Sequence, residues 1–188
     1  MYHKLVGLQA KSVKSNESID AVWSRLVSRA TRVALMRQDT SYARLAQALT
    51  GLGIAESARS IEGKIQRGTF RFSFFLQAAV AANTDIPGAW ADALRSADSW
   101  DQRAAAVLEA ELAQQPWVDH DRLAVRLGEI GVVVPPAALG AQIRDGSFPA
   151  VLFFQCATVC RFESVYRFID ASSLHQAALW GAGAATQD

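Results

Sequence analysis

Apolar residues recur at three- and four-residue steps along most of the chain, which is the spacing of amphipathic α-helices. The clearest stripe consists of Trp23, Leu26, Ala30 and Val33. It predicts a helix over about residues 19 to 37. Further helices are expected from Thr40, taken as an N-cap, to Gly53, then over about 56 to 67 and over a nearly apolar, buried stretch at about 72 to 83.

The same pattern occurs twice, at an offset of 78 residues. Segments 42–82 and 120–160 align without a gap, and eleven of their forty-one residue pairs are identical. The identical pairs are mostly apolar residues at helical spacing, so a packing scheme is repeated. Four equivalent phenylalanines are expected in the core: Phe70, Phe75, Phe148 and Phe153. Two copies are too few for a solenoid, and the sequence therefore predicts an all-α protein of two tandem units with four or five helices each.

This interpretation divides the chain into four segments. Residues 1–16 are expected to form a basic, flexible arm, and residues 17–98 the first unit. Residues 99–179 form the second unit, with a final helix near 163 to 179, and residues 180–188 a disordered tail.

Two short motifs carry a resemblance to known domains. Leu45-Ala46 with Leu49, followed by Ile65-Gln66-Arg67-Gly68 and an apolar helix, resembles the helix-turn-helix of Cro and repressor proteins. Gly63 to Phe70 and Ala141 to Phe148 resemble more closely a family of small uncharacterised bacterial domains with a signature near Asn-Lys-Ile-x-Arg-Gly-x-Phe. Both copies lack the asparagine of that signature. The resemblance implies two helix-turn-helix-like units with a DNA-binding type of fold and brings no known activity.

Charge is distributed unevenly along the chain. Residues 1–72 contain twelve Lys and Arg against five Asp and Glu, a balance of +7. Residues 73–188 contain seven against thirteen, a balance of −6. A basic first half suggests a polyanionic partner, and with the helix-turn-helix resemblance the expected partner is double-stranded DNA.

The third helix of the first unit is the expected recognition helix, because the second helix of a helix-turn-helix motif enters the major groove. With Ile61 and Ile65 buried, its outward polar residues become DNA-contact candidates. These are Ser57, Arg59, Ser60, Lys64 and Arg67. Arg59 suits a guanine edge, whereas Lys64 and Arg67 suit phosphates. The alternative is that all of them are ordinary solvated residues.

Two further groups of residues are candidate phosphate contacts. Thr40 and Ser41 precede the second helix and offer hydroxyl or backbone donors. Arg25, Arg29 and Arg32 lie on one face of the first helix, and that helix has no carboxylate at matching spacing. The arginines therefore form either a phosphate-binding row or an ordinary soluble surface.

The second copy keeps the packing residues and loses the polar face. Its outward positions are expected at Ala138, Gly140 and Gln142, and Asp145 replaces Arg67. The stretch from Val132 to Pro136 is expected to be exposed. We therefore interpret the second unit as an assembly unit that makes the protein a homodimer.

Other function classes fit the sequence less well. The three histidines are scattered, Asp119-His120-Asp121 is read as a helix-capping loop, and Cys156 and Cys160 as core fillers, so neither an enzyme, a metal site nor a cofactor is expected. The aromatic residues are expected in the core, which disfavours RNA binding. With no signal peptide or membrane span, the chain is expected to be a cytoplasmic, sequence-specific DNA-binding transcriptional regulator. The alternative is a protein-interaction adaptor on the same scaffold.

Overall fold

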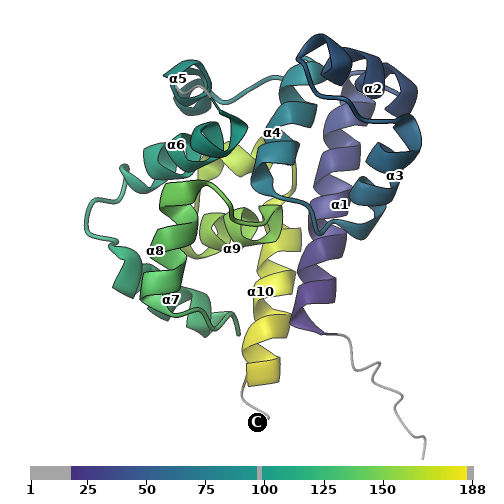
Figure 1. The fold of residues 1–188 in the computed structure, drawn as a ribbon. Coiled ribbons are helices and arrows are strands. Elements are labelled where there is room, and N and C mark those ends of the chain that lie inside the picture. Colours follow the sequence, from purple (N-terminus) through teal and green to yellow (C-terminus); the bar gives the residue numbers. More distant parts are fainter. Residues whose placement is uncertain (1–17, 97–98, 186–188) are drawn as a thin grey trace, which may run out of the picture.

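The computed structural model describes residues 18–96 and 99–185, and all regular elements in these ranges are helical (Figure 1). The first half contains α1 (Ile19–Arg37), α2 (Tyr42–Gly51), α3 (Ala58–Arg67), α4 (Phe72–Ala81) and α5 (Gly88–Ser96). The second half contains α6 (Trp100–Leu112), α7 (His120–Glu129), α8 (Pro136–Asp145), α9 (Ala150–Cys160), the short 3₁₀ helix η1 (Glu163–Arg167) and α10 (Ala171–Ala185). The predicted all-α class with two helical units is confirmed.

Side-chain caps determine where several helices begin. Ser41 caps α2, since its hydroxyl accepts the Arg44 N–H at 3.2 Å. The prediction that Thr40 is the cap is therefore wrong. The Thr40 hydroxyl donates instead to the Gln38 carbonyl oxygen at 3.1 Å, inside the turn that precedes the helix. Asp119, the residue equivalent to Ser41, caps α7 in the second unit.

The C-terminal region differs from the expectation in two ways. The helix expected near 163 to 179 is split into η1 and α10, because the Asp170 carboxylate accepts the Ser173 N–H at 2.8 Å and starts a new helix. Helix α10 also continues to Ala185. The expectation of a disordered tail is therefore wrong for residues 180–185.

The expected N-terminal arm, residues 1–16 with Lys4, Lys11 and Lys14, lies outside the described residues.

The two units meet at an antiparallel backbone bridge between equivalent segments. The Phe72 N–H donates to the Phe148 carbonyl oxygen at 3.1 Å, and the Ala150 N–H donates to the Phe70 carbonyl oxygen at 2.9 Å. The 78-residue offset converts each of these hydrogen bonds into the other. Arg71 also pairs with Pro149, its own equivalent. The units are therefore related by an approximate two-fold axis through the bridge.

Aromatic rings fill the space around this axis. The Phe72 ring stacks on Phe153 of the other unit, with centroids 3.8 Å apart and planes at 11°. The residue equivalent to Phe72 is Ala150, which is fully buried, so one large ring occupies the space on the axis. A second phenylalanine there would overpack the core. The predicted burial of four phenylalanines is confirmed for Phe70, Phe75, Phe148 and Phe153.

The first helix of each unit also packs against the other unit. Helix α1 contacts α3 and α4 of its own unit, and α9 and α10 of the second unit. Helix α6 contacts α8 of its own unit, and α4 and α5 of the first. Figure 1 shows α10 running alongside α1. A single apolar core therefore extends through both copies. The boundary between the copies separates two sequence repeats and does not separate two cores.

The glycine that ends α3 allows a close approach between helices. Gly68 has φ +66°, and a Cβ added there would lie 1.9 Å from the Ser24 carbonyl oxygen of α1. In the second unit, Gly146 has the same φ and the same relation to Asp101 of α6. Gly53 has φ +79° but no atom within 4 Å of an added Cβ. A substitution at Gly53 therefore introduces backbone strain alone, whereas a substitution at Gly68 introduces backbone strain and a clash with α1.

We expect Gly53→Ala to lower the free energy of unfolding by about 1–2 kcal/mol, the cost of placing a side chain in the left-handed region. Gly68→Ala should cost clearly more, because α1 must also move away from α3. Urea unfolding of both variants measures the difference. Equal losses would contradict the close α1–α3 packing.

Candidate nucleic-acid interface

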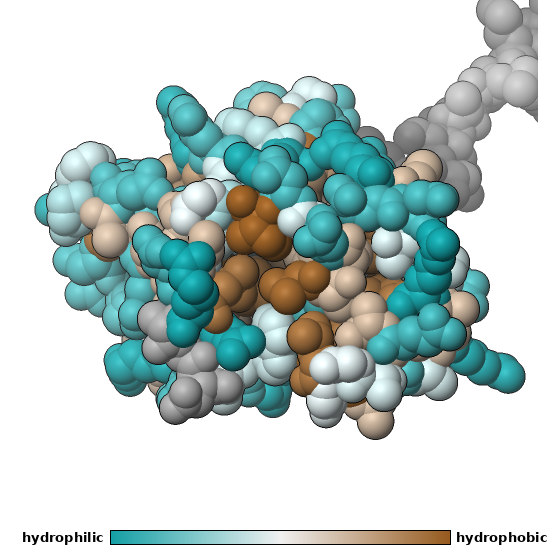
Figure 2. All heavy atoms as spheres, turned by 90° about the horizontal axis from the view of Figure 1, so that it is seen from above, coloured by the Kyte–Doolittle hydropathy of each residue, from teal (hydrophilic) through white to brown (hydrophobic). Residues whose placement is uncertain are grey.

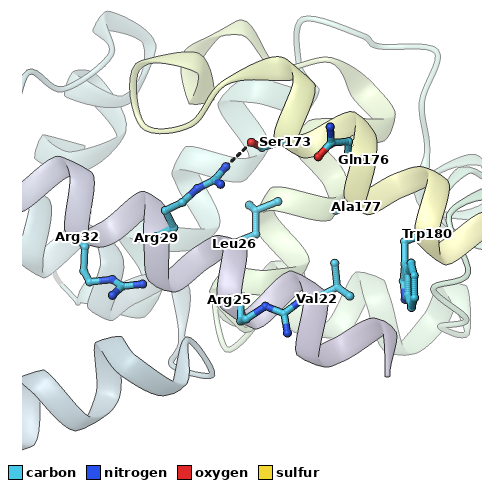
Figure 3. Close-up of a pocket in the computed structure, with 9 residues that line it drawn as sticks. All are labelled: Val22, Arg25, Leu26, Arg29, Arg32, Ser173, Gln176, Ala177 and Trp180. Atoms are coloured by element: carbon cyan, nitrogen blue, oxygen red, sulfur yellow. Dashed lines mark hydrogen bonds between the residues drawn. The ribbon is translucent and has the colours of Figure 1, made fainter. Parts of the chain in front are cut away.

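The three arginines of α1 border a groove between the two units. Arg25, Arg29 and Arg32 are exposed, because Trp23 and Val27 turn the opposite face of the helix into the core. Figure 3 shows them along α1, with α10 forming the other wall. The groove has a volume of about 530 Å³. The residues of α10 that line it are Ser173, Gln176, Ala177 and Trp180.

Arg29 is tied to α10. Its guanidinium donates a hydrogen bond to the Ser173 hydroxyl and lies 3.4 Å from the Asp170 carboxylate. Hydrogen bonds from Ser172 and Ser173 hold the pKa of Asp170 well below its ordinary value, so the carboxylate is ionised at neutral pH. Both side chains of the ion pair are more than half exposed, so it stabilises the fold little. The first helix alone offers Arg29 no carboxylate partner, and the fold brings one from 141 residues away.

A second groove, of about 670 Å³, continues from Arg32 to the start of α2. Thr40, Ser41 and Arg44 line it. Arg44 lies 3.8 Å from Asp39, and both side chains are exposed. Because Arg32 borders both grooves, the predicted residues of α1 and of the α2 start lie along one continuous surface.

The polar residues at the start of α3 are engaged within the protein. Ser57 caps the helix by accepting the Ser60 N–H at 3.1 Å, and the Ser60 hydroxyl donates to Glu56 at 2.7 Å. Lys64 forms an ion pair with Glu56 and lies 5.1 Å from the centre of the Phe74 ring. Burial alone would raise the pKa of Glu56, but the hydrogen bonds from Lys64 and Ser60 and the Lys64 charge lower it below its ordinary value. Lys64 is therefore partly neutralised.

Arg59 and Arg67 of α3 have solvent-accessible guanidinium groups. Both residues are exposed, and neither side chain makes a hydrogen bond or ion pair with another residue in the described ranges. The Arg67 guanidinium lies over Gly63 and borders a hollow of about 400 Å³ at the start of α4. Neither arginine lines the two grooves beside α1.

The second unit lacks these cations at equivalent positions. Aligning Trp23 with Trp100 replaces the three α1 arginines by Gln102, Ala106 and Glu109. The 78-residue offset replaces Arg59, Lys64 and Arg67 by Ala137, Gln142 and Asp145. The counterpart of the second groove is lined by Glu109, Asp119 and His120. The packing is thus kept in both copies while the surface charge changes from basic to neutral or acidic.

Two expectations about the second unit are wrong in detail. Gly140 does not face outward but is buried, and a Cβ added there would lie 2.6 Å from the His120 ring. The absence of a side chain therefore makes room for the histidine. In the stretch from 132 to 136, Val133 is 93% exposed, but Val132 and Val134 pack against the core.

The expectation that the aromatic residues lie in the core is also wrong for three of those in the described ranges. Trp117 is 57% exposed, and Tyr166 and Trp180 are each 44% exposed. Trp180 belongs to the groove beside α1, together with Gln176 and Ser173. The sequence analysis assigned Trp180 to a disordered tail, and it expected Ser173 and Gln176 in a final helix without placing that helix beside α1. Their only local signal is the apolar spacing that Leu174 and Ala177, both buried, give to α10.

The connection between α2 and α3 is longer than in a helix-turn-helix. It comprises six residues, 52–57, where such motifs have a turn of about three to four. The equivalent connection, residues 130–135, has the same length.

Comparison with known proteins identifies the repeated unit. Residues 23–86 and 100–165 each match the family described as a domain of unknown function, DUF6471. The chain belongs to this family. The two matches span α1 to α4 and α6 to α9, which confirms a tandem repeat of one domain, and they leave α10 outside. No curated protein and no solved structure matches the chain, so the resemblance to Cro and repressor proteins stays a hypothesis.

Neither a metal site nor a membrane helix is found in the part of the chain that the structure describes. No three metal-ligating side chains gather there. None of the described helices combines the length and the apolar character that crossing a bilayer requires.

We expect the Glu56–Lys64 ion pair to contribute stability at neutral pH that is lost in acid. Because the folded-state pKa of Glu56 is lowered, this contribution is present above the ordinary glutamate pKa and disappears as the pH falls through the folded-state value. Glu56→Gln should therefore be less stable than the parent at pH 7, with a smaller difference at pH 3. Urea unfolding at both pH values measures this. The same substitution in a Lys64→Met background should show a reduced pH effect, and an unchanged effect would contradict the ion pair.

Proposed function

We propose that this DUF6471 protein binds double-stranded DNA through its first unit and regulates transcription without enzymatic activity. One observation carries the proposal. Two copies of the same domain share their core residues, yet six arginine and lysine positions of α1 and α3 are neutral or acidic at the equivalent positions of the second copy, where α6 and α8 keep only Arg103 and Arg144 at other positions. Packing cannot account for charges that the equivalent positions lack, whereas a polyanionic partner of the first unit can.

The roles of the residues follow from their positions. Arg25, Arg29 and Arg32 would contact phosphates along the groove beside α1, and Thr40 and Ser41 would add hydroxyl donors where that surface reaches α2.

On α3, Arg59 would contact a base edge and Arg67 a phosphate, since both are exposed and have no ion-pair partner in the described residues. Lys64 would contribute less, because Glu56 already binds it. Ser57 and Ser60 would help to position the helix start rather than contact the bases.

Replacing the exposed arginines of α1 and α3 by alanine should weaken DNA binding in two distinct ways. Arg59→Ala should lower affinity for the preferred site by about 1–3 kcal/mol and blur the preference at one base pair. Arg32→Ala and Arg67→Ala should weaken binding to all duplexes and each reduce the salt slope by about one unit. The measurement is fluorescence anisotropy against a site selected from a random DNA pool and a scrambled duplex, at several salt concentrations.

Arg144→Ala is the matched control, because Arg144 is an exposed arginine on α8, the helix equivalent to α3. It should leave both affinities within about twofold of the parent. If Arg144→Ala abolished binding while the variants of the first unit did not, the roles of the two units would be reversed. If no duplex were selected, the DNA-binding proposal would be wrong.

Self-association through the second unit is part of the proposal. Trp117 and Val125 are apolar and 57% and 68% exposed, whereas the equivalent residues of the first unit are Asp39 and Gln47. A contiguous exposed apolar patch marks a protein contact, and the proposal takes these two side chains as parts of one. Sedimentation velocity at tens of micromolar should show a homodimer that Trp117→Ala weakens. A strict monomer with and without DNA would contradict this part.

The same apolar side chains favour a second candidate, a protein-interaction adaptor. The six-residue connection before α3 also departs from DNA-reading motifs. The face seen in Figure 2 is mostly hydrophilic, with hydrophobic side chains gathered in one hollow, so that face offers a partner protein little apolar surface outside the hollow. A partner complex that is insensitive to salt, together with absent DNA binding, would replace the first proposal by this one.

A further inference from the structure

The groove beside α1 combines cations on one wall with an aromatic ring on the other. Arg25 and Arg32 extend from α1, and Trp180 stands on α10 near Val22 at the far end of the groove (Figure 3). The Trp180 side chain is 44% exposed, so part of its surface remains accessible in the folded chain. Gln176, one turn before it on α10, is also exposed and offers an amide that can both donate and accept hydrogen bonds.

We propose that this groove binds a single-stranded segment of nucleic acid, with its backbone along the α1 arginines and one unpaired base stacked on Trp180. A positively charged groove that follows the backbone, combined with an aromatic ring for the bases, is the general means by which proteins hold single strands. A paired base inside a duplex is stacked on its neighbours and offers no free face to a side chain. The tryptophan therefore selects unpaired nucleotides, which the arginines alone do not.

The dimensions of the groove agree with a short segment. Arg25 and Arg32 are seven residues apart on α1, which corresponds to about 10 Å along the helix axis. At about 3.4 Å per stacked nucleotide, this length accommodates about three phosphates. The Asp170 carboxylate, 3.4 Å from Arg29, places a negative charge beside the α10 wall and would repel a phosphate from that wall.

The groove is formed by the first copy of the domain together with the helix that follows the second copy. Its arginines come from the first copy, and its tryptophan and glutamine come from α10, which follows the second copy and lies outside the family match. The equivalent surface of α6 has Gln102, Ala106 and Glu109 in place of the arginines, so it lacks the row of cations that would attract a phosphate backbone. Within residues 18–96 and 99–185, the duplicated domain thus forms one such site.

The inference rests on the proposed nucleic-acid-binding role of α1, and it is tested with the full-length chain. Fluorescence anisotropy compares a labelled 12-nucleotide oligothymidine strand with a labelled duplex of the same length. Trp180→Ala should weaken binding to the single strand by about 5- to 150-fold, the loss expected for one stacked base, and change duplex affinity less than twofold. Trp180→Phe should restore most of the single-strand affinity, because phenylalanine retains a face for stacking.

Tyr166→Ala is the matched control, since Tyr166 is an aromatic residue as exposed as Trp180 that lies outside the groove. It should change neither affinity. Unaltered single-strand binding by Trp180→Ala, an equal loss for Tyr166→Ala, or an equal loss of duplex binding would overturn the inference. Duplex binding without single-strand binding would overturn it and leave the proposed function standing. If the parent chain bound neither the single strand nor the duplex, the inference and the proposed function would both be wrong.

Discussion

The structure depends on one contact, the antiparallel bridge between Phe70–Phe72 and Phe148–Ala150 with the Phe72 ring stacked on Phe153. Two backbone hydrogen bonds align the units, and the stacked, fully buried rings exclude water from the axis between them. From this contact the other packing follows. Helix α4 is brought against α6, α9 against α1, and the last helix of each half against the first helix of the other.

This packing of helices of each unit against the other unit explains how a duplicated domain could acquire different surfaces. Residues at the axis serve both units at once, so their size is constrained, and the pair Phe72 and Ala150 shows that even a difference there must be complementary. Arg25, Arg29 and Arg32 of α1 are exposed, and their counterparts on α6 are exposed or only partly buried, so this constraint is weaker there. A change from arginine to glutamine, alanine or glutamate leaves the core intact, and the two faces of one molecule can differ in charge.

Local features of the fold could be predicted from the sequence because their causes are local. The apolar stripe of α1, the glycine that ends α3 and the buried phenylalanines all follow from spacing and from the conformational freedom of glycine. The features that were missed depend on distant residues. The partner of Arg29 lies 141 residues away, and α10 gains its order by packing against α1. The position of Trp180 in the groove follows from that contact, so no window of the sequence around residue 180 could reveal it.

The central claim is that the two copies share one core, and calorimetry of the full chain tests it most directly. A shared core should unfold in a single transition whose calorimetric and van't Hoff enthalpies agree. Phe153→Ala, a change in the second copy, should lower the midpoint of that whole transition, in keeping with the loss of about 3–5 kcal/mol expected for a buried phenylalanine. Two separate transitions, of which Phe153→Ala shifts only one, would contradict the account.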